Sequence, residues 1–423
     1  MRLVLLAVAW CLLPVMLAGQ TPDAPIILLT PDRIYDGAVM RTGWSVLVRN
    51  QRIIGVGPGL ETAAPPDARR IALSGMTLLP GLIEGHSHLL LHPYNETPWD
   101  DQVLHESLAL RVARAVNHAR RTLEAGFTTV RDLGTEGAGE ADVGLRDAIE
   151  QGIIPGPRVL ATTRAIVATG SYGPSGFDSR WRIPQGAEEA SGLEELTRVV
   201  RSQAAHGADW IKVYADYRWG ASGETRPTFS MEELTRLVET ARSGGRPVVA
   251  HASSAEAIRR AVVAGVETIE HGDAGSADVF RLMAQKNVAL CPTLAAVEAI
   301  RQYRGWKKGS EPEPAEVTEK KASFKRALAA RVPICFGSDV GVFPHGDNVR
   351  ELELMVEYGM TAPDVVRAAT SGNARIFHLE DRLGQVKVGF LADLIAVEGD
   401  PTVRIGDLRK VRMVMKGGQV IRP

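Results

Sequence analysis

The sequence predicts an α/β protein: a (β/α)₈ TIM barrel with a small β-sandwich domain built from both ends of the chain. Eight apolar, strand-like runs occur between residues 77 and 339, and a segment with helical spacing follows most of them. Both chain ends contain mainly strand-like segments. Eight β/α repeats over about 300 residues are typical of this barrel. A doubly wound open sheet is the alternative, but it usually carries a glycine-rich phosphate loop, which is missing after the first run here.

The barrel is predicted to span residues 80–380. Its β runs are Thr77–Pro80 leading into Gly85, Thr128–Asp132, Arg158–Ile166, Trp210–Ala215, Pro247–His251, Val266–His271, Val288–Leu294 and Ile334–Asp339. Apolar residues at three- and four-residue steps predict helices over residues 104–123, 194–204, 231–241 and 255–264.

The chain ends are predicted to form one composite β-domain from residues 21–79 and 381–423. The termini of a domain tend to lie close together, which favours pairing between the two ends. The predicted strands include residues 44–48 and 52–56, joined by a tight turn, and residues 393–397 and 411–415.

Residues 1–20 have the plan of a secretory signal peptide: a positive start at Arg2 and an apolar stretch from Leu3 to Ala18, followed by small or polar residues. We therefore expect a periplasmic or extracellular protein with no stable membrane span after signal removal. An uncleaved membrane anchor is the alternative, because no clean Ala-x-Ala site precedes Thr21. The apolar run is shorter than the ~20 residues that a span needs.

The composition is that of an ordinary globular protein, with 45% apolar and 23% charged residues among 423. The 49 basic and 50 acidic residues leave a net charge of −1, which argues against nucleic-acid binding. Of three cysteines, Cys291 and Cys335 lie beyond the signal segment, both in apolar runs. We expect them to be buried free thiols, and we predict no disulfide.

Metal-ligating residue types stand at the carboxyl ends of five β runs, where barrels carry their chemistry. His86 and His88 are two residues apart in an extended segment, so both side chains face the same side. The other candidates are Lys212 on the fourth run, His251 on the fifth, His271 on the sixth and Asp339 on the eighth. Imidazole and carboxylate together suit Zn²⁺ and related divalent ions.

Each of these residues alone has an ordinary structural interpretation. A single strand-end histidine is usually a hydrogen-bonded packing residue, a lysine such as Lys212 can extend its charge to solvent, and Asp339 can cap a helix. The occurrence of all six at the same end of separate β runs is what predicts a metal site.

This ligand order resembles that of the amidohydrolase superfamily: His-x-His on the first strand, Lys on the fourth, His on the fifth and sixth, and Asp on the eighth. Pro80–Ile83 resembles that superfamily's entry into the barrel, and Leu383–Leu394 resembles its return to the β-domain. The resemblance covers essentially all of the chain after the signal segment. It is greatest for the imidazolonepropionase-like branch, which includes secreted Xaa-Pro and other C-terminal-residue dipeptidases and ochratoxin-hydrolysing amidases. Trp210–Tyr217 and Ala168–Gly173 resemble the peptidase members.

The resemblance implies two Zn²⁺ or other divalent ions bridged by carbamylated Lys212. His86, His88 and Asp339 would hold one ion, and His251 and His271 the other. A neutral lysine amine can react with CO₂, and the two carbamate oxygens can bridge ions about 3.5–4 Å apart. A mononuclear site with unmodified Lys212 is the alternative. Asp339 is the candidate catalytic residue, placed to take a proton from metal-bound water and pass it to the leaving amine.

Two positions depart from the family pattern. Glu84 stands where an Asp usually precedes the first His by two residues, and Thr169-Gly170-Ser171-Tyr172 replaces a common Thr-Gly-Gly-His. A substrate-holding histidine of many relatives is therefore missing, and the substrate cannot simply be copied from them.

Candidate substrate-binding residues follow the third, fourth and eighth runs. Phenol hydroxyls and a guanidinium suit a substrate carboxylate. The candidates are Tyr172, Tyr214, Tyr217, Arg218 or Arg180, and His345. Tyr214 as an inward barrel residue and His345 as a solvated loop residue are the structural alternatives.

We therefore predict an exported metal-dependent hydrolase that uses metal-bound hydroxide to cleave an amide bond to a C-terminal amino acid. Its substrate would be a dipeptide or small molecule, as for a dipeptidase, a carboxypeptidase-like enzyme or an N-acyl amino acid amidase, with ochratoxin A as one candidate substrate. A lactonase or a hydrolase of cyclic amidines or imidazolones is the alternative, because the hydroxide attack is shared. Two alternatives to an enzyme are a barrel without metal that only binds a ligand and an exported protein that stores metal. The resemblance also implies a homo-oligomer.

Overall fold

The computed structural model of the chain describes residues 25–178, 180–219 and 223–422. The predicted signal peptide, residues 1–20, lies outside them. Among the helices in the described part of the chain, none is both long enough and apolar enough to cross a membrane.

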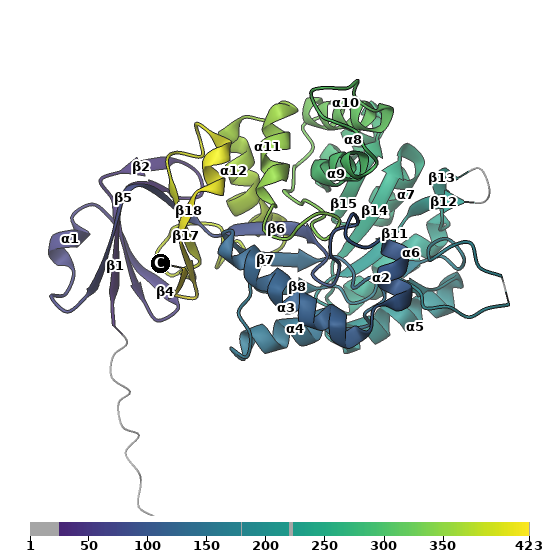
Figure 1. Cartoon of the computed structure of the whole chain (residues 1–423), viewed down its shortest axis with the longest axis horizontal. Coiled ribbons are helices and arrows are strands. Elements are labelled where there is room, and N and C mark those ends of the chain that lie inside the picture. Colours follow the sequence, from purple (N-terminus) through teal and green to yellow (C-terminus); the bar gives the residue numbers. More distant parts are fainter. Residues whose placement is uncertain (1–24, 179, 220–222, 423) are drawn as a thin grey trace, which may run out of the picture.

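The middle of the chain forms parallel strands that follow one another around a barrel (Figure 1). The first array is β6 (Leu82–Ser87), β7 (Phe127–Asp132) and β8 (Arg158–Ala161). The second is β10 (Glu188–Glu189), β9 (Ile166–Val167), β11 (Ile211–Tyr214), β14 (Val248–Ser254), β15 (Thr268–Ala274) and β16 (Ala289–Cys291). Parallel bridges from Leu290 to Ile334 and from Ser87 to Val340 place residues 334–340 between β16 and β6. The predicted (β/α)₈ barrel is confirmed, with an extended segment as its eighth strand.

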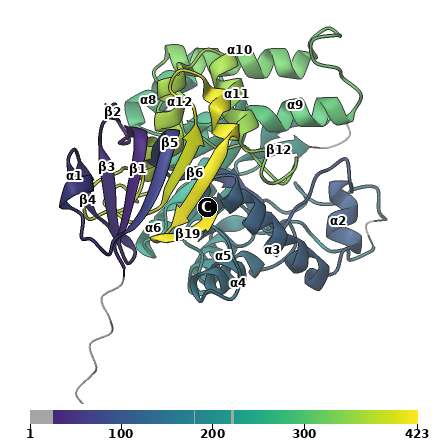
Figure 2. The same ribbon diagram turned by 60° about the vertical axis from the view of Figure 1, so that its left-hand side comes forward.

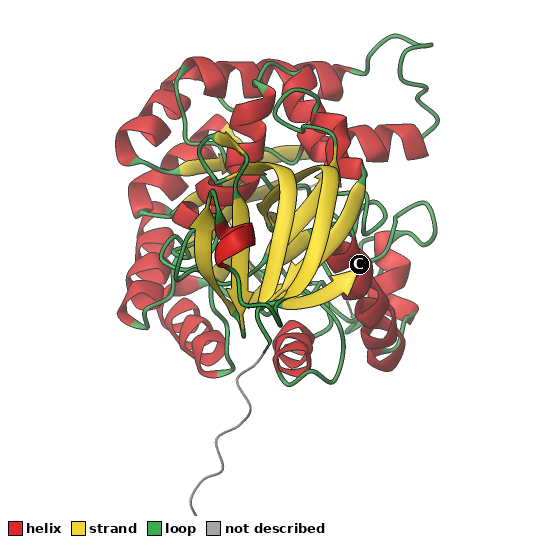
Figure 3. Cartoon of the chain, turned by 90° about the vertical axis from the view of Figure 1, so that its left-hand side faces the viewer, coloured by secondary structure: helices red, strands yellow, loops and turns green. Residues whose placement is uncertain are grey.

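Helices surround the strands (Figure 3). They are α2 (Trp99–His105), α3 (Leu108–Glu124), α4 (Ala141–Glu150), α5 (Gly192–Ala205), α6 (Met231–Ser243), α7 (Ala255–Ala264), α8 (Ala277–Lys286), α9 (Leu294–Tyr303), α10 (Ala315–Ala329), α11 (Val349–Glu357), α12 (Ala362–Arg367) and α13 (Asn373–Ile376), with a π-helical turn over residues 368–372. In α6, Ser230 and Glu233 each accept a hydrogen bond from the other's backbone N–H, which starts the helix. The predicted helix over residues 104–123 is instead two helices, because the Ser107 side chain caps α3 by accepting from Leu110 N.

The two chain ends meet in one eight-stranded sheet with the order β19-β18-β17-β5-β1-β3-β4, in which β2 pairs with β1 (Figure 2). Its strands are β1 (Ile27–Tyr35), β2 (Met40–Thr42), β3 (Ser45–Arg49), β4 (Arg52–Gly57), β5 (Arg69–Pro80), β17 (Leu394–Glu398), β18 (Val411–Lys416) and β19 (Gln419–Arg422). The short helix α1 (Leu60–Ala63) follows β4, and a 3₁₀ turn (Ile405–Arg409) precedes β18. The sheet curls so that its edge strand β4 reaches the segment before β17, where the backbone N–H of Ile53 donates to Phe390 O and Arg52 forms an antiparallel bridge with Leu391. Strands from both chain ends lie in one sheet, as the fold prediction requires. The domain boundaries near residues 80 and 380 stay a prediction.

This sheet has two buried faces, which follow from the alternation of side chains along its strands. In β17, Leu394 and Ala396 point into the core enclosed by the curled sheet. Ile395 and Val397 point the other way, into a cluster that includes Phe127 and other barrel residues. The sheet therefore packs against the barrel and fixes where β6 enters it.

The prediction of free thiols at Cys291 and Cys335 is wrong. The two cysteines form a disulfide between β16 and the neighbouring barrel segment, with Cα atoms 4.6 Å apart. Leu290 and Ile334, one residue before each cysteine, pair in a parallel bridge. Two residues 44 positions apart thus become neighbours only when the barrel closes, which sequence spacing alone does not reveal.

Candidate active site

Five of the six predicted metal ligands line one cavity of about 450 Å³ at the carboxyl ends of the barrel strands. His86, His88, His251, His271 and Asp339 all line it. A larger hollow of about 1230 Å³ lies at the opposite ends of the strands, lined by residues such as Glu267 and Val288 that precede β15 and β16. In the described part of the chain, the group able to hold a metal ion is His86, His88 and Asp339, so chemistry rather than size selects the smaller cavity.

His86, His88 and Asp339 form a compact donor set. The Nε2 atoms of His86 and His88 lie 3.5 and 3.3 Å from Asp339 Oδ1. Burial raises the pKa of Asp339, but the adjacent His86, His88 and Lys212 outweigh this effect and lower it to about 2. The side chain is thus a carboxylate at neutral pH, as metal ligation requires.

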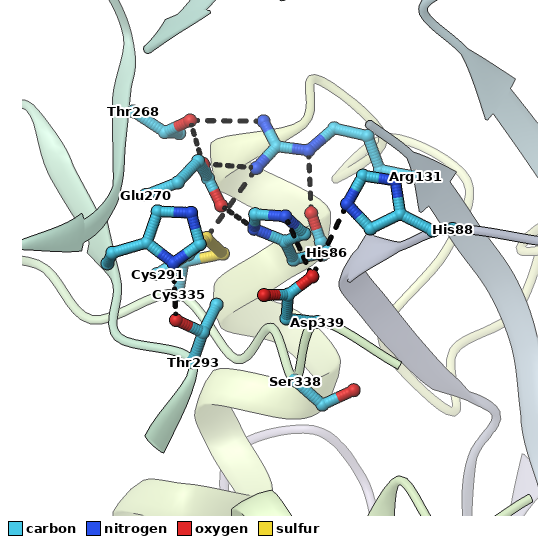
Figure 4. Close-up of polar contacts among 12 residues, drawn as sticks. His86, His88, Arg131, Thr268, Glu270, Cys291, Thr293, Cys335, Ser338 and Asp339 are labelled. Atoms are coloured by element: carbon cyan, nitrogen blue, oxygen red, sulfur yellow. Dashed lines mark hydrogen bonds and ion pairs between the residues drawn. A yellow bond between two sulfur atoms is a disulfide. The ribbon is translucent and has the colours of Figure 1, made fainter. Parts of the chain in front are cut away.

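The Nδ1 atoms of the candidate ligand histidines have hydrogen-bond partners of their own, and the contact between His86 and Glu270 is drawn in Figure 4. His86 Nδ1 lies 2.7 Å from Glu270 Oε2, and His88 Nδ1 lies 2.8 Å from Gly134 O. His271 Nδ1 lies 2.8 Å from Thr293 Oγ1. Such outer partners fix ring orientation and leave Nε2 directed toward a metal.

Glu270 is itself held by a buried ion pair, since Arg131 Nη2 donates to its Oε1 at 2.8 Å. Arg131 also donates to Gly85 O and to Thr268 Oγ1 (Figure 4). Sequence reasoning missed this pair, although Arg131 stands in β7 and Glu270 directly precedes the candidate ligand His271. Charged residues inside barrel strands are the signal that could have identified them.

His251 and His271 form the second set of imidazoles. Their ring centroids are 4.4 Å apart, and the His271 ring lies 5.1 Å from that of His86. Burial, followed by the charge of Lys212, lowers the pKa of His251 to about 3, and burial holds the pKa of His271 well below its usual value. Both are neutral imidazoles, the form that ligates metal.

Lys212 is the polar group that the protein itself does not satisfy. Its side chain is fully buried, and Nζ has no hydrogen-bond partner among the described residues. Burial lowers the pKa of Lys212 to about 8. A buried, unpartnered amine is costly, and a neutral one is the form that CO₂ modifies, so this residue fits a bridging carbamate. The donor set as a whole fits divalent metal.

Strained backbone marks the same cavity. His271, Thr293 and Asp339 have positive φ values of 74°, 51° and 63° without being glycine. Glu136, which also lines the cavity, has φ 50°. Residues other than glycine seldom adopt this left-handed conformation, and those that do are often at functional sites.

Glu84 ties the eighth strand to the first. It accepts hydrogen bonds from Ser338 N, Ser338 Oγ and Asn348 Nδ2, and from its own neighbour His86 N. Burial raises the pKa of Glu84 to about 7. Because the Glu84 carboxylate binds the backbone N–H groups of both His86 and Ser338, it holds Asp339, the residue after Ser338, near His86.

Most of the predicted substrate-binding residues also reach the cavity. Tyr172, Tyr214, Tyr217 and Arg218 line it, and the Tyr214 ring stacks on His251 at a centroid distance of 4.5 Å. Arg180 does not reach it, because this exposed residue forms an ion pair with Asp178.

His345 was expected near substrate, with a solvated loop position as the alternative, and neither prediction is right. The ring is buried, stacks on His118 at 4.3 Å and has Nε2 3.1 Å from Leu91 O. It lies outside the cavity because the loop after Asp339 turns back under the neighbouring helix α3.

Glu136, Tyr94, Arg301 and Arg304 line the cavity but were not anticipated from the sequence. Glu136 could have been found, because it follows the carboxyl end of β7 by four residues. The arginines belong to α9 and the segment after it, and their approach depends on how that helix leans over the barrel.

A barrel that gathers imidazoles, a buried amine and a carboxylate at the carboxyl ends of its strands is the architecture of a metal-dependent hydrolase. The model of the amidohydrolase family matches residues 77–421, and the chain belongs to this family. It is therefore a hydrolase that acts on amide bonds.

Relatives of known activity and structure support this assignment. The chain is 29% identical to the ochratoxinase of Aspergillus niger, over 99% of this chain and 93% of the relative. It is similar to the crystal structure of a Xaa-Pro dipeptidase with bound methionine, with 31% identity, a TM-score of 0.83 and coverage of 94% and 100% of the two chains. A prolidase complexed with N-methylphosphonate-L-proline has 26% identity, a TM-score of 0.80 and coverage of 94% and 99%.

Proposed function

We propose that this protein is a binuclear metal-dependent amidohydrolase that cleaves the amide bond to a C-terminal amino acid. The observation that carries the proposal is the buried Lys212 amine without a hydrogen-bond partner among the described residues. Its Nζ lies 5.4 Å from the centre of the Tyr214 ring, and Tyr214 lines the cavity together with the four imidazoles and Asp339. A carbamate on Lys212 would satisfy that position and bridge two ions, with His86, His88 and Asp339 on one and His251 and His271 on the other.

The protein's own residues then have separate tasks. When bound, divalent ions would supply the Lewis-acid chemistry of the reaction. Asp339 Oδ1, ionised and directed into the cavity, accepts the proton of the attacking water and delivers it to the leaving amine. Glu270, Gly134 O and Thr293 keep the imidazole rings oriented throughout.

The charge distribution of the cavity supports a substrate with a free carboxylate. Arg218 and Arg304 are exposed at its rim, and Arg218 lies over the Tyr217 ring at 5.5 Å. Guanidinium and phenol groups suit carboxylate binding. The relatives support the same substrate class, since a Xaa-Pro dipeptidase holds methionine, a free amino acid, in its active site.

We propose that the protein is exported, as the signal-like residues 1–20 suggest. The disulfide between Cys291 and Cys335 supports this location, because disulfides persist in oxidising compartments and are rare in reducing ones.

Metal analysis and a substrate panel test the proposal together. We expect about two equivalents of divalent metal per chain, and turnover of dipeptides or N-acyl amino acids that stops when the C-terminal carboxylate is esterified. Equal activity on the esters, or activity on lactones alone, would contradict the proposed bond. Well under one equivalent of metal in active protein would contradict the proposed centre.

A further inference from the structure

Glu136 is a buried carboxylate at the cavity wall whose hydrogen bonds fall mainly on one oxygen. Oε2 accepts from Tyr172 Oη at 2.5 Å and from Trp99 Nε1 at 2.9 Å. Oε1 has a single long contact, 3.4 Å to Tyr214 Oη. A carboxylate can accept about four hydrogen bonds, so Oε1 has capacity left for a ligand in the cavity.

Among the described residues, no lysine or arginine side chain forms an ion pair with the Glu136 carboxylate. The Arg111 guanidinium interacts with it electrostatically but donates to the Glu136 backbone oxygen instead. The one ion-pair contact of Glu136 within the described residues is with a histidine: its Oε1 lies 4.0 Å from His88 Nδ1. That nitrogen lies 2.8 Å from Gly134 O, where it donates its hydrogen bond instead. Glu136 is only 2% exposed, and His88 would be a neutral imidazole when it ligates a metal, which would leave this buried anion without a paired cation at a cost in free energy. The site is therefore suited to a cation supplied by the substrate.

The backbone at Glu136 is strained and is fixed by hydrogen bonds from Arg111. Glu136 has φ 50°, a strained value for a residue with a side chain. The buried guanidinium of Arg111 donates to Glu136 O at 2.6 Å, to Thr135 O and to Leu90 O. Strained backbone conformations that are held by such hydrogen bonds occur most often at functional sites.

Aromatic rings surround the carboxylate. The Tyr172 ring lies 4.9 Å from each of the rings of Trp99, Tyr214 and Tyr217. Aromatic faces together with a carboxylate form an environment that attracts an ammonium group. Burial, followed by the charge of Glu136, holds the pKa of the Tyr172 and Tyr214 hydroxyls well above the usual value, so these groups stay uncharged.

The cavity is lined by groups of both charges. Glu136 is buried near His88, whereas Arg218 and Arg304 are exposed. A dipeptide also carries both charges, because its α-ammonium and its α-carboxylate flank the scissile amide.

We propose that Glu136 binds the α-ammonium group of the N-terminal residue of a dipeptide, so that the enzyme prefers unblocked dipeptides to N-acyl amino acids. This inference rests on the proposed function and sharpens it, since that function covers both substrate classes. Glu136 makes no bond to reacting atoms and acts as a specificity-determining residue.

A pair of substrates that differ only in the ammonium group tests this role: L-alanyl-L-phenylalanine and N-propionyl-L-phenylalanine. We expect wild-type protein to favour the dipeptide in kcat/KM. Glu136→Gln keeps an acceptor for Tyr172 and Trp99 but removes the charge. We expect it to lower kcat/KM for the dipeptide by about 10- to 100-fold, mainly through KM, while the propionyl substrate changes by less than about threefold. Asp178→Asn, which removes an exposed carboxylate outside the cavity, is the matched control and should leave the preference unchanged.

Two results would overturn the inference while the proposed function stands: equal wild-type turnover of the two substrates, or an equal loss of both in Glu136→Gln. The second result would mean that Glu136 only positions Tyr172 and Trp99. If wild-type protein cleaves neither these substrates nor any other amide of the panel, the proposed function fails, and calorimetric titration of the metal-loaded protein with glycinamide and N-acetylglycinamide decides the inference alone. Glycinamide binding weakened at least tenfold by Glu136→Gln supports the ammonium site, and unchanged binding refutes it.

Discussion

The barrel mouth and the terminal sheet bury opposite kinds of side chain. At the mouth, His86, Arg131, Lys212 and Glu270 are all at most 1% exposed, and several neighbouring residues have strained backbones. In the terminal sheet, apolar side chains form the core enclosed by the strands, with Leu394 as one of its fully buried members. The difference shows that one region is organised for chemistry at a cost in stability, while the other contributes stability by hydrophobic burial.

The largest expected effect is the loss of catalysis in Lys212→Ala. Removal of an outer partner of a metal ligand usually costs 10- to 100-fold, so loss of a bridging ligand should reduce kcat/KM by about 10³-fold or more. Metal content should fall with activity when both are measured on washed protein. Lys387→Ala, on the exposed surface, is the control. Unchanged metal content in Lys212→Ala would rule out the bridging role.

Breaking the buried ion pair behind His86 should have the largest effect on stability. Arg131→Met leaves the Glu270 charge without its partner, and we expect a loss of about 3–5 kcal/mol in the free energy of unfolding. Denaturant unfolding of metal-free protein measures it. The double variant with Glu270→Leu should recover part of the loss, because no unpaired charge remains. A double variant less stable than the single one would contradict this explanation.

In the terminal sheet, Leu394→Ala should destabilise the fold without touching the chemistry. A large-to-small change at a fully buried position costs about 2–5 kcal/mol. Because Leu394 lies outside the cavity, metal stoichiometry and kcat at low temperature should match those of wild type. A proportional loss of metal would show that the two regions are not separable in this way.

The disulfide joins two strands below the mouth, and its removal should have an intermediate effect. Cys291→Ala with Cys335→Ala is expected to cost about 2–4 kcal/mol, mainly because the unfolded chain gains freedom. Thiol titration of unfolded, non-reduced protein should detect neither cysteine. Two reactive thiols per chain would support the free-thiol prediction made from the sequence instead.

A pH dependence of stability is expected from Glu351, which is buried behind the mouth. Burial raises the pKa of Glu351 to about 8, although hydrogen bonds from Leu294 N and Ala295 N oppose the shift. Between its ordinary pKa of 4.5 and 8, the folded protein holds a proton that the unfolded chain has lost, so stability falls as pH rises through this window. Glu351→Gln should flatten the slope of unfolding free energy against pH. Glu353→Gln, on the same helix but partly exposed, should not.

The sequence alone determined the barrel, the pairing of the chain ends and the set of candidate metal ligands. Apolar periodicity reports burial directly, and residues at the carboxyl ends of parallel strands must meet at one face of the barrel. This is why the sequence groups His86 and His88 with Asp339, although Asp339 lies far along the chain from the two histidines.

Only the tertiary structure decided the contacts that depend on how separate elements pack. The Cys291–Cys335 disulfide, the Arg131–Glu270 pair, the inward turn of His345 and the ring-lined position of Glu136 each need two or more segments in their final places. Periodicity describes one element at a time, whereas these contacts have directions and distances set by neighbouring strands and helices. Pairing between buried polar groups therefore becomes visible only in the folded barrel, because burial is what makes such pairing necessary.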